Sequence, residues 1–144
     1  MDLTPLIGIL AGIVAAFGFN RYVGARPKRA REFWILGLIV ATLIYVVLAV
    51  VNGESTEAVL IESVGVLVFG AFILLSVVHH SWWLALGWLL HPVWDIALHH
   101  PMGDFTHAPE WYVWACLAFD LVVGVTIWRV SKNAARFDVQ QSAE

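Results

Sequence analysis

Residues 57–100 read EAVLIESVGVLVFGAFILLSVVHHSWWLALGWLLHPVWDIALHH, and this stretch decides the fold. A single helix of roughly 44 residues would be ~66 Å long, about twice the ~30 Å hydrocarbon core of a bilayer. The chain must therefore reverse inside the stretch. His79, His80 and Ser81 separate its two apolar runs. We expect two antiparallel membrane helices here, over residues 57–78 and 82–99.

The rest of the chain adds three more apolar runs, over residues 3–19, 33–51 and 110–130. Of the 144 residues, 60% are hydrophobic and 13% are charged, against about 45–50% apolar and 25% charged in soluble domains. The mean hydropathy is +0.80. The sequence predicts an all-α integral membrane protein, one domain over residues 1–144 with five transmembrane helices. Its main partner is then the lipid bilayer, and nothing points to a nucleic acid.

The basic residues predict the orientation of these spans. All eight lysines and arginines fall on one side of a five-span arrangement, between Arg21 and Arg31 and between Arg129 and Arg136. Because lysine and arginine favour the cytoplasmic side, we expect the N-terminus outside and the C-terminus in the cytoplasm of a cell membrane, in particular the bacterial inner membrane. The first apolar run is expected to be a retained span, since its basic residues follow it, unlike those of a signal peptide.

Polar residues concentrate where chemistry is expected. All six histidines lie between His79 and His107. His91, Asp95 and His99 are spaced i, i+4, i+8, which keeps them on one helical face. At ~1.5 Å per residue, Asp120 of the last span reaches the depth of His91, and Glu62 of the third span reaches that of Asp95.

Acidic groups inside a bilayer need a partner, because an aspartate at a helix centre costs about 2.5–3.5 kcal/mol. Apart from Arg129 at the inner end of the last span, no lysine or arginine lies within the spans to neutralise them. These acids can still be neutralised by protonation, by a protonated histidine or by a bound cation. Of the cations, Zn²⁺ and iron suit a mixed set of imidazole and carboxylate ligands. The predicted metal ligands are His91, Asp95, His99, His100 and Glu62, and the predicted catalytic carboxylates are Asp95, Glu62 and Asp120. The alternative is a set of protonated, hydrogen-bonded acids without a metal.

Other cofactors are not expected. The chain has no glycine-rich phosphate loop, which argues against a nucleotide. A haem held by two histidines needs them at one depth on facing helices, and only His91 is deep. Gly8, Gly12 and Ala16 form a small-residue stripe that permits close helix packing, either in a homodimer or within the bundle.

The histidine-rich stretch loosely resembles two groups of membrane metalloenzymes. Di-iron hydroxylases and desaturases carry His-x3-His and His-x2-His-His boxes, whereas His91 and His99 here are eight residues apart. Hydrolases related to alkaline ceramidase use three histidines, an aspartate and a serine around zinc, with about seven spans. In size, and in its His-Pro-x-Trp-Asp and His-His pattern, the chain is more similar to small bacterial multi-spanning membrane proteins classed as domains of unknown function, a resemblance that implies no activity.

Three functions follow from these residues. The first is a metal-dependent membrane enzyme acting on a lipid-like or other apolar substrate. The second is a metal-ion or proton transporter that uses Glu62, His91, Asp95 and Asp120 as a relay. The third is a non-catalytic membrane or assembly protein with a structural polar core.

Overall fold

The chain folds into five α-helices and one short 3₁₀ helix. The computed structural model describes residues 2–99 and 108–141, and no strand occurs among them. Its elements are α1 (Thr4–Gly24), η1 (Pro27–Arg29), α2 (Ala30–Val51), α3 (Thr56–Val78), α4 (Trp82–His99) and α5 (Glu110–Gln141). The expected all-α fold with five helices is confirmed.

Four segments are long and apolar enough to span a membrane among the described residues: Thr4–Gly24, Pro27–Val51, Thr56–Val78 and Glu110–Ala134. The fifth, α4, is only 18 residues long and contains Pro92 together with His91, Asp95 and His99. The shortest α-helix therefore carries three of the seven buried polar or charged side chains among the described residues.

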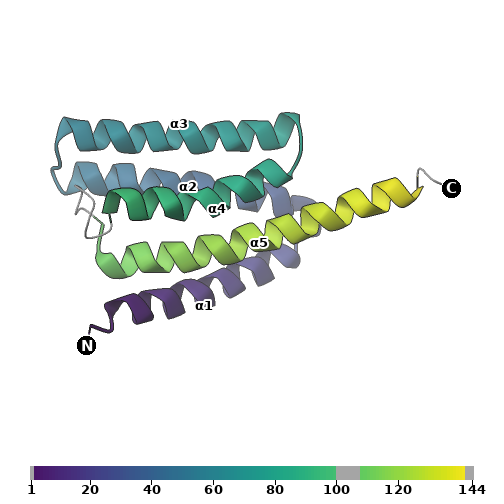
Figure 1. Ribbon diagram of the computed structural model, residues 1–144, viewed down its shortest axis with the longest axis horizontal. Helices are drawn as coiled ribbons and strands as arrows, with labels where there is room; N and C mark the ends of the chain where they lie inside the picture. The colour runs from purple at the N-terminus through teal and green to yellow at the C-terminus, as the bar shows by residue number, and fades with distance from the viewer. Residues whose placement is uncertain (1, 100–107, 142–144) are drawn as a thin grey trace.

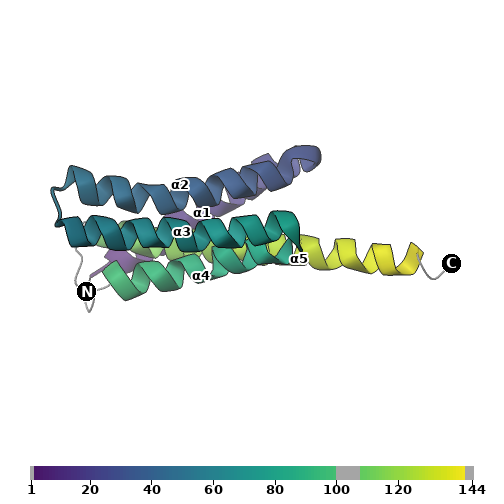
Figure 2. The same ribbon diagram turned by 90° about the horizontal axis from the view of Figure 1, so that it is seen from above.

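The helices run up and down along one long axis (Figures 1 and 2). One end of the bundle holds every lysine and arginine of the described residues, and we call it the basic end. It contains η1, the α3–α4 turn and the C-terminal part of α5. The opposite end, with Glu54, Glu57 and Glu110, is the acidic end. Charge is thus segregated along the axis as the sequence predicted.

Local signals set the helix boundaries. Gly53 adopts a φ of +68° between α2 and α3, a conformation that glycine reaches at little cost. Ser55 then caps α3 by accepting a hydrogen bond from the backbone N–H of Ala58 at 3.2 Å. At the other end, the Ser81 hydroxyl bonds to that of Ser131 on α5 at 3.0 Å. The α3–α4 turn is therefore fastened to α5.

The last helix is longer than predicted. We expected a span over residues 110–130 and a polar terminus, but α5 continues to Gln141 and projects beyond the other helices (Figure 1). Residues 131–141 contain neither glycine nor proline, the two residues that most disfavour a helix. The polar residues near its C-terminus end the segment that could span a membrane at Ala134, but the helix itself continues to Gln141.

Helix α1 packs mainly on α5. A Cβ atom added to Gly8 would collide with the backbone carbonyl of Trp111, and one added to Gly12 would collide with that of Ala115. The side-chain amide of Asn20 also donates to the Thr126 hydroxyl at 3.1 Å. The small-residue stripe is thus used for packing within the bundle.

The core is divided along the bundle axis. Toward the basic end it is apolar, with Trp88 fully buried and its indole N–H donating to the backbone carbonyl of Trp34 at 3.1 Å. Leu38, Leu84 and Ile127 pack in the same cluster. Toward the acidic end, the interior contains buried polar side chains instead.

Candidate metal centre

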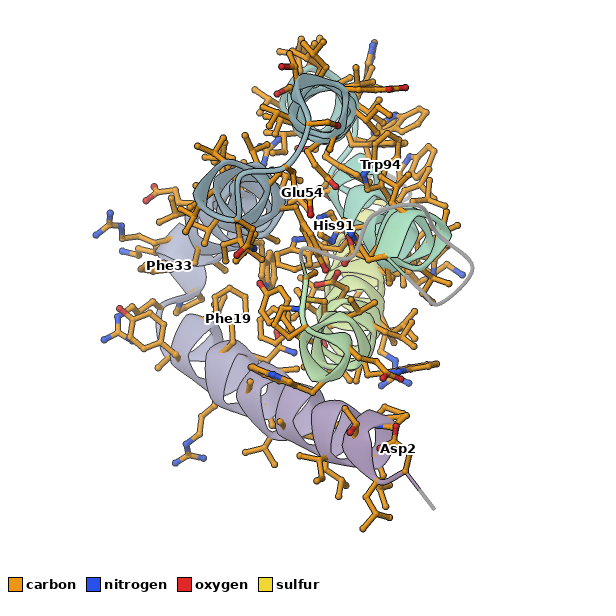
Figure 3. All side chains as sticks on the ribbon, turned by 90° about the vertical axis from the view of Figure 1, so that its left-hand side faces the viewer. Asp2, Phe19, Phe33, Glu54, His91 and Trp94 are labelled. Carbon is orange, nitrogen blue, oxygen red and sulfur yellow. The ribbon has the colours of Figure 1, made fainter. Side chains whose placement is uncertain are left out.

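Three buried side chains from two helices meet at the centre of the polar region. His91 and Asp95 lie one turn apart on α4, and Asp120 faces them from α5. His91 Nδ1 is 2.8 Å from Asp120 Oδ2 and 3.4 Å from Asp95 Oδ2. Figure 3 shows His91 pointing into the interior of the bundle. The predicted common depth of His91 and Asp120 is confirmed.

A second imidazole–carboxylate pair lies next to this trio. His99 Nε2 is 2.9 Å from Glu62 Oε1, which joins α4 to α3. The pair is buried, and its charges are close enough to the trio to interact with His91 and Asp95. The sequence placed Glu62 at the level of Asp95, but its contact is one turn farther along α4.

Tyr45 of α2 connects the two groups. Its ring stacks on His99, with centroids 4.6 Å apart and planes 13° from parallel, and lies 6.0 Å from the His91 ring. Its buried hydroxyl faces Asp95 and Cys116 without a hydrogen bond of ordinary geometry. Four helices, α2 to α5, therefore contribute to one polar cluster.

Aromatic rings close the cluster on the α3 side. Phe69 meets the His91 ring edge-on at 4.9 Å, and Trp94 meets Phe69 edge-on at 6.2 Å. Gly65 makes room for this wall, since an added Cβ atom would lie 3.0 Å from the Trp94 indole. This packing holds His91 from one side while the carboxylates hold it from the other.

The trio sets two carboxylates against one imidazole, so one negative charge has no matching positive charge when both carboxylates are ionised. Asp95 is 0% exposed, and its contacts with His91 Nδ1, at 3.4 Å, and with the Tyr45 hydroxyl do not have hydrogen-bond geometry. Buried polar groups are normally hydrogen-bonded, and buried charges are paired or bind a metal. No lysine or arginine is close, because these residues lie at the basic end. The chemistry of the donors therefore fits a cation.

The donor spacing also fits a small cation. One ligand atom from each of His91, Asp95 and Asp120 can be chosen so that all three lie within 4.8 Å of one another. Ligands placed about 2.1 Å from a tetrahedral Zn²⁺ are about 3.4 Å apart. Side-chain shifts of about an ångström would be enough to bring these atoms to that spacing.

The structure groups the predicted site residues differently from the sequence prediction. Asp120, expected as a catalytic carboxylate, joins His91 and Asp95 in the possible ligand set. Glu62 and His99 form the adjacent pair. His100 lies outside the described residues.

Sequence reasoning missed Tyr45. It is 1% exposed in the second half of α2, where every other residue after Thr42 is apolar. Tyrosine usually needs a hydrogen-bond partner when buried, so a tyrosine this far from either end of a predicted span was the available signal.

No protein-family model, curated protein or solved structure matches this chain. What the cluster does must therefore be inferred from its own side chains.

Proposed function

We propose that the chain is a multi-pass membrane protein that binds a divalent transition metal, Zn²⁺ or iron, through His91, Asp95 and Asp120. The observation that carries the proposal is the convergence of these three buried side chains, with two carboxylates on one imidazole and no lysine or arginine near them. A cation would supply the charge that the surrounding protein lacks.

The proposed orientation places the N-terminus outside and the C-terminus in the cytoplasm of a cell membrane. The basic end would then be cytoplasmic. The polar cluster would lie in the outer half of the bilayer, separated from the cytoplasm by the apolar cluster around Trp88 and Leu38.

Within that site, we propose enzymatic chemistry on an apolar substrate. A metal held by His91, Asp95 and Asp120 would supply Lewis acidity and would lower the pKa of a bound water toward neutral pH. The Glu62–His99 pair, at 2.9 Å, can hold and release a proton beside the trio. Tyr45, stacked on His99, fixes the plane of that imidazole.

Transport is the weaker alternative. A transported ion or proton would need polar groups from the cluster to the basic end, but Leu38, Leu84, Trp88 and Ile127 are nearly or fully buried along that route. These apolar side chains offer no polar group to solvate a charge, so they oppose an ion path through this part of the bundle. The tight apolar packing therefore favours a site that is approached from one side.

The first test is the metal content of the purified protein, measured by elemental mass spectrometry after exposure to Zn²⁺ or Fe²⁺ and removal of excess ion. We expect close to one metal per chain, and its loss in His91→Ala and Asp120→Ala. The matched control is His80→Ala, since His80 is exposed at the basic end. Wild-type protein that stays metal-free after metal is supplied would overturn the proposal.

A second test separates enzyme from transporter. Metal-loaded protein in proteoliposomes should show no metal or proton flux above that of His91→Ala. Flux that depends on His91 would favour transport instead.

A further inference from the structure

A cavity of about 380 Å³ lies between α1, α2 and α5 and reaches the candidate metal centre. Asp120 belongs to the candidate metal centre and also lines the cavity, where it is the only charged residue among those that line it. Tyr112 and Cys116 line it beside Asp120. His91, Asp95 and Asp120 are all buried, so this cavity offers a molecule a route to Asp120 from the side of the bundle.

Small residues create the space. Ala11 and Ala15 of α1 face Gly37 and Ala41 of α2 across it. Figure 3 shows α1 leaning away from α2, with Phe19 in the angle between them. Several of the residues that line the cavity are exposed, among them Ala15 of α1 and Val40 of α2. In the proposed membrane, the cavity would therefore open toward lipid.

The cavity is closed toward the basic end. The Phe19 ring lies 5.6 Å from that of Phe119 and 6.5 Å from that of Trp88, and the last two are 5.8 Å apart. Trp88 and Phe119 also line the cavity. A molecule that enters from the side would be stopped by these rings at the level of Asp120.

We infer that this cavity binds one hydrocarbon chain of a lipid-like molecule and brings it beside Asp120. The inference deepens the proposed function, on which it rests, by naming the substrate class of the metal centre. Apolar walls favour hydrocarbon, and about 380 Å³ is within the range of small-molecule pockets. Because Asp120 is acidic, the polar group of the ligand should be a hydrogen-bond donor, such as a hydroxyl, and not an anion.

Size favours an alkyl chain over the main alternative occupant, a helix from a second copy of the chain. A helix about 10 Å across fills roughly 420 Å³ per 5.4 Å turn. The cavity would hold less than one turn of it. A single alkyl chain is slender enough to enter between α1 and α2.

The test uses a long-chain alcohol that carries a photoactivatable diazirine in mid-chain, with cross-linked peptides mapped by mass spectrometry. Ala15→Phe fills the cavity from the α1 wall, and Ala41→Phe fills it from the α2 wall. Gly18→Phe is the matched control on α1, because nothing lies within 4 Å of a Cβ atom at Gly18. Far-ultraviolet circular dichroism and gel filtration confirm that each variant is folded.

In wild-type protein, we expect labels on the residues of α1, α2 and α5 that line the cavity. Labelling should fall about tenfold in Ala15→Phe and Ala41→Phe and stay unchanged in Gly18→Phe. Equal labelling of all outward helix faces, or labelling that neither filling variant reduces, would overturn the inference. So would a cross-linked dimer through α1, which would make a second copy the occupant.

The same experiment is run on chelator-treated protein, and the metal content of each variant is measured. Loss of labelling with normal metal content contradicts the hydrocarbon site alone. Normal labelling in a protein that never binds metal contradicts the proposed metal centre and leaves the hydrocarbon site in place.

Discussion

Replacing Asp95 by leucine is expected to stabilise the metal-free protein, whereas the same substitution at Asp120 is expected to destabilise it. Asp95 is fully buried, and its two oxygens lack hydrogen bonds, a situation that costs about 1–3 kcal/mol. Replacing a whole buried ion pair by hydrophobic side chains often stabilises a protein by about 1–4 kcal/mol, and Asp95→Leu removes the carboxylate with the longer of the two contacts to His91 while the contact with Asp120 stays. We therefore expect Asp95→Leu to raise the free energy of unfolding of the metal-free protein by about 1–3 kcal/mol.

Asp120 differs because its carboxylate is 2.8 Å from His91 Nδ1. Removing it leaves a buried imidazole without its closest partner, and breaking a buried pair in this way costs about 3–5 kcal/mol. Added metal should remove most or all of the advantage of Asp95→Leu over the wild type. At a hundred times Kd, it stabilises the wild type by about 2.7 kcal/mol, and it should stabilise neither variant because each lacks a proposed ligand.

Thermal unfolding in detergent, with chelator and then with Zn²⁺, measures these effects. One kcal/mol corresponds to roughly 2–4 °C in Tm for a chain of about this size. Asp95→Leu should therefore raise the Tm of chelator-treated protein by about 3–9 °C, and Asp120→Leu should lower it by about 10 °C. If both substitutions lower the Tm by similar amounts, Asp95 is compensated within the protein, and the case for a cation there fails.

Three other predictions concern packing, the second polar pair and topology. Gly12→Ala should lower the free energy of unfolding by about 1–3 kcal/mol, because the added Cβ atom meets the Ala115 backbone. Gly18→Ala has open space around it and should raise this free energy by about 0.5–1 kcal/mol. Denaturant titration measures both changes. Glu62→Leu should lower the free energy of unfolding by about 3–5 kcal/mol. Glu62→Gln should lower it less, because the amide keeps a polar group beside His99. Equal losses in the same titration would contradict a stabilising polar contact between the two side chains. A reporter fused to the C-terminus should be active only in the cytoplasm, and activity outside would reverse the proposed orientation.

The helix count and the meeting of His91 with Asp120 could be predicted because both follow from distance along a helix axis. Apolar run lengths give the spans, and a constant rise per residue gives the depth of each side chain. Rotation about the axis and the choice of neighbour do not follow from these quantities. Sequence reasoning therefore placed Glu62 near the correct level without identifying His99 as its contact.

The same limit explains Tyr45 and the cavity. Tyr45 enters the cluster because α2 packs beside α3 and α4, an arrangement that no spacing within α2 encodes. The stripe of Gly8, Gly12 and Ala16 predicted close packing but not that α5 would be the neighbour. The space beside Asp120 exists because α1 packs against α5 and makes little contact with α2.

That pairing of α1 with α5 has a consequence for biosynthesis. The two partners of the Asn20–Thr126 hydrogen bond are separated by 106 residues, so α1 is made long before the surface it packs against. Until α5 arrives, the glycine face of α1 has no closely fitting neighbour. Assembly should therefore finish with the docking of α5, which brings Asp120 to His91 and joins α1 to the bundle in a single late step.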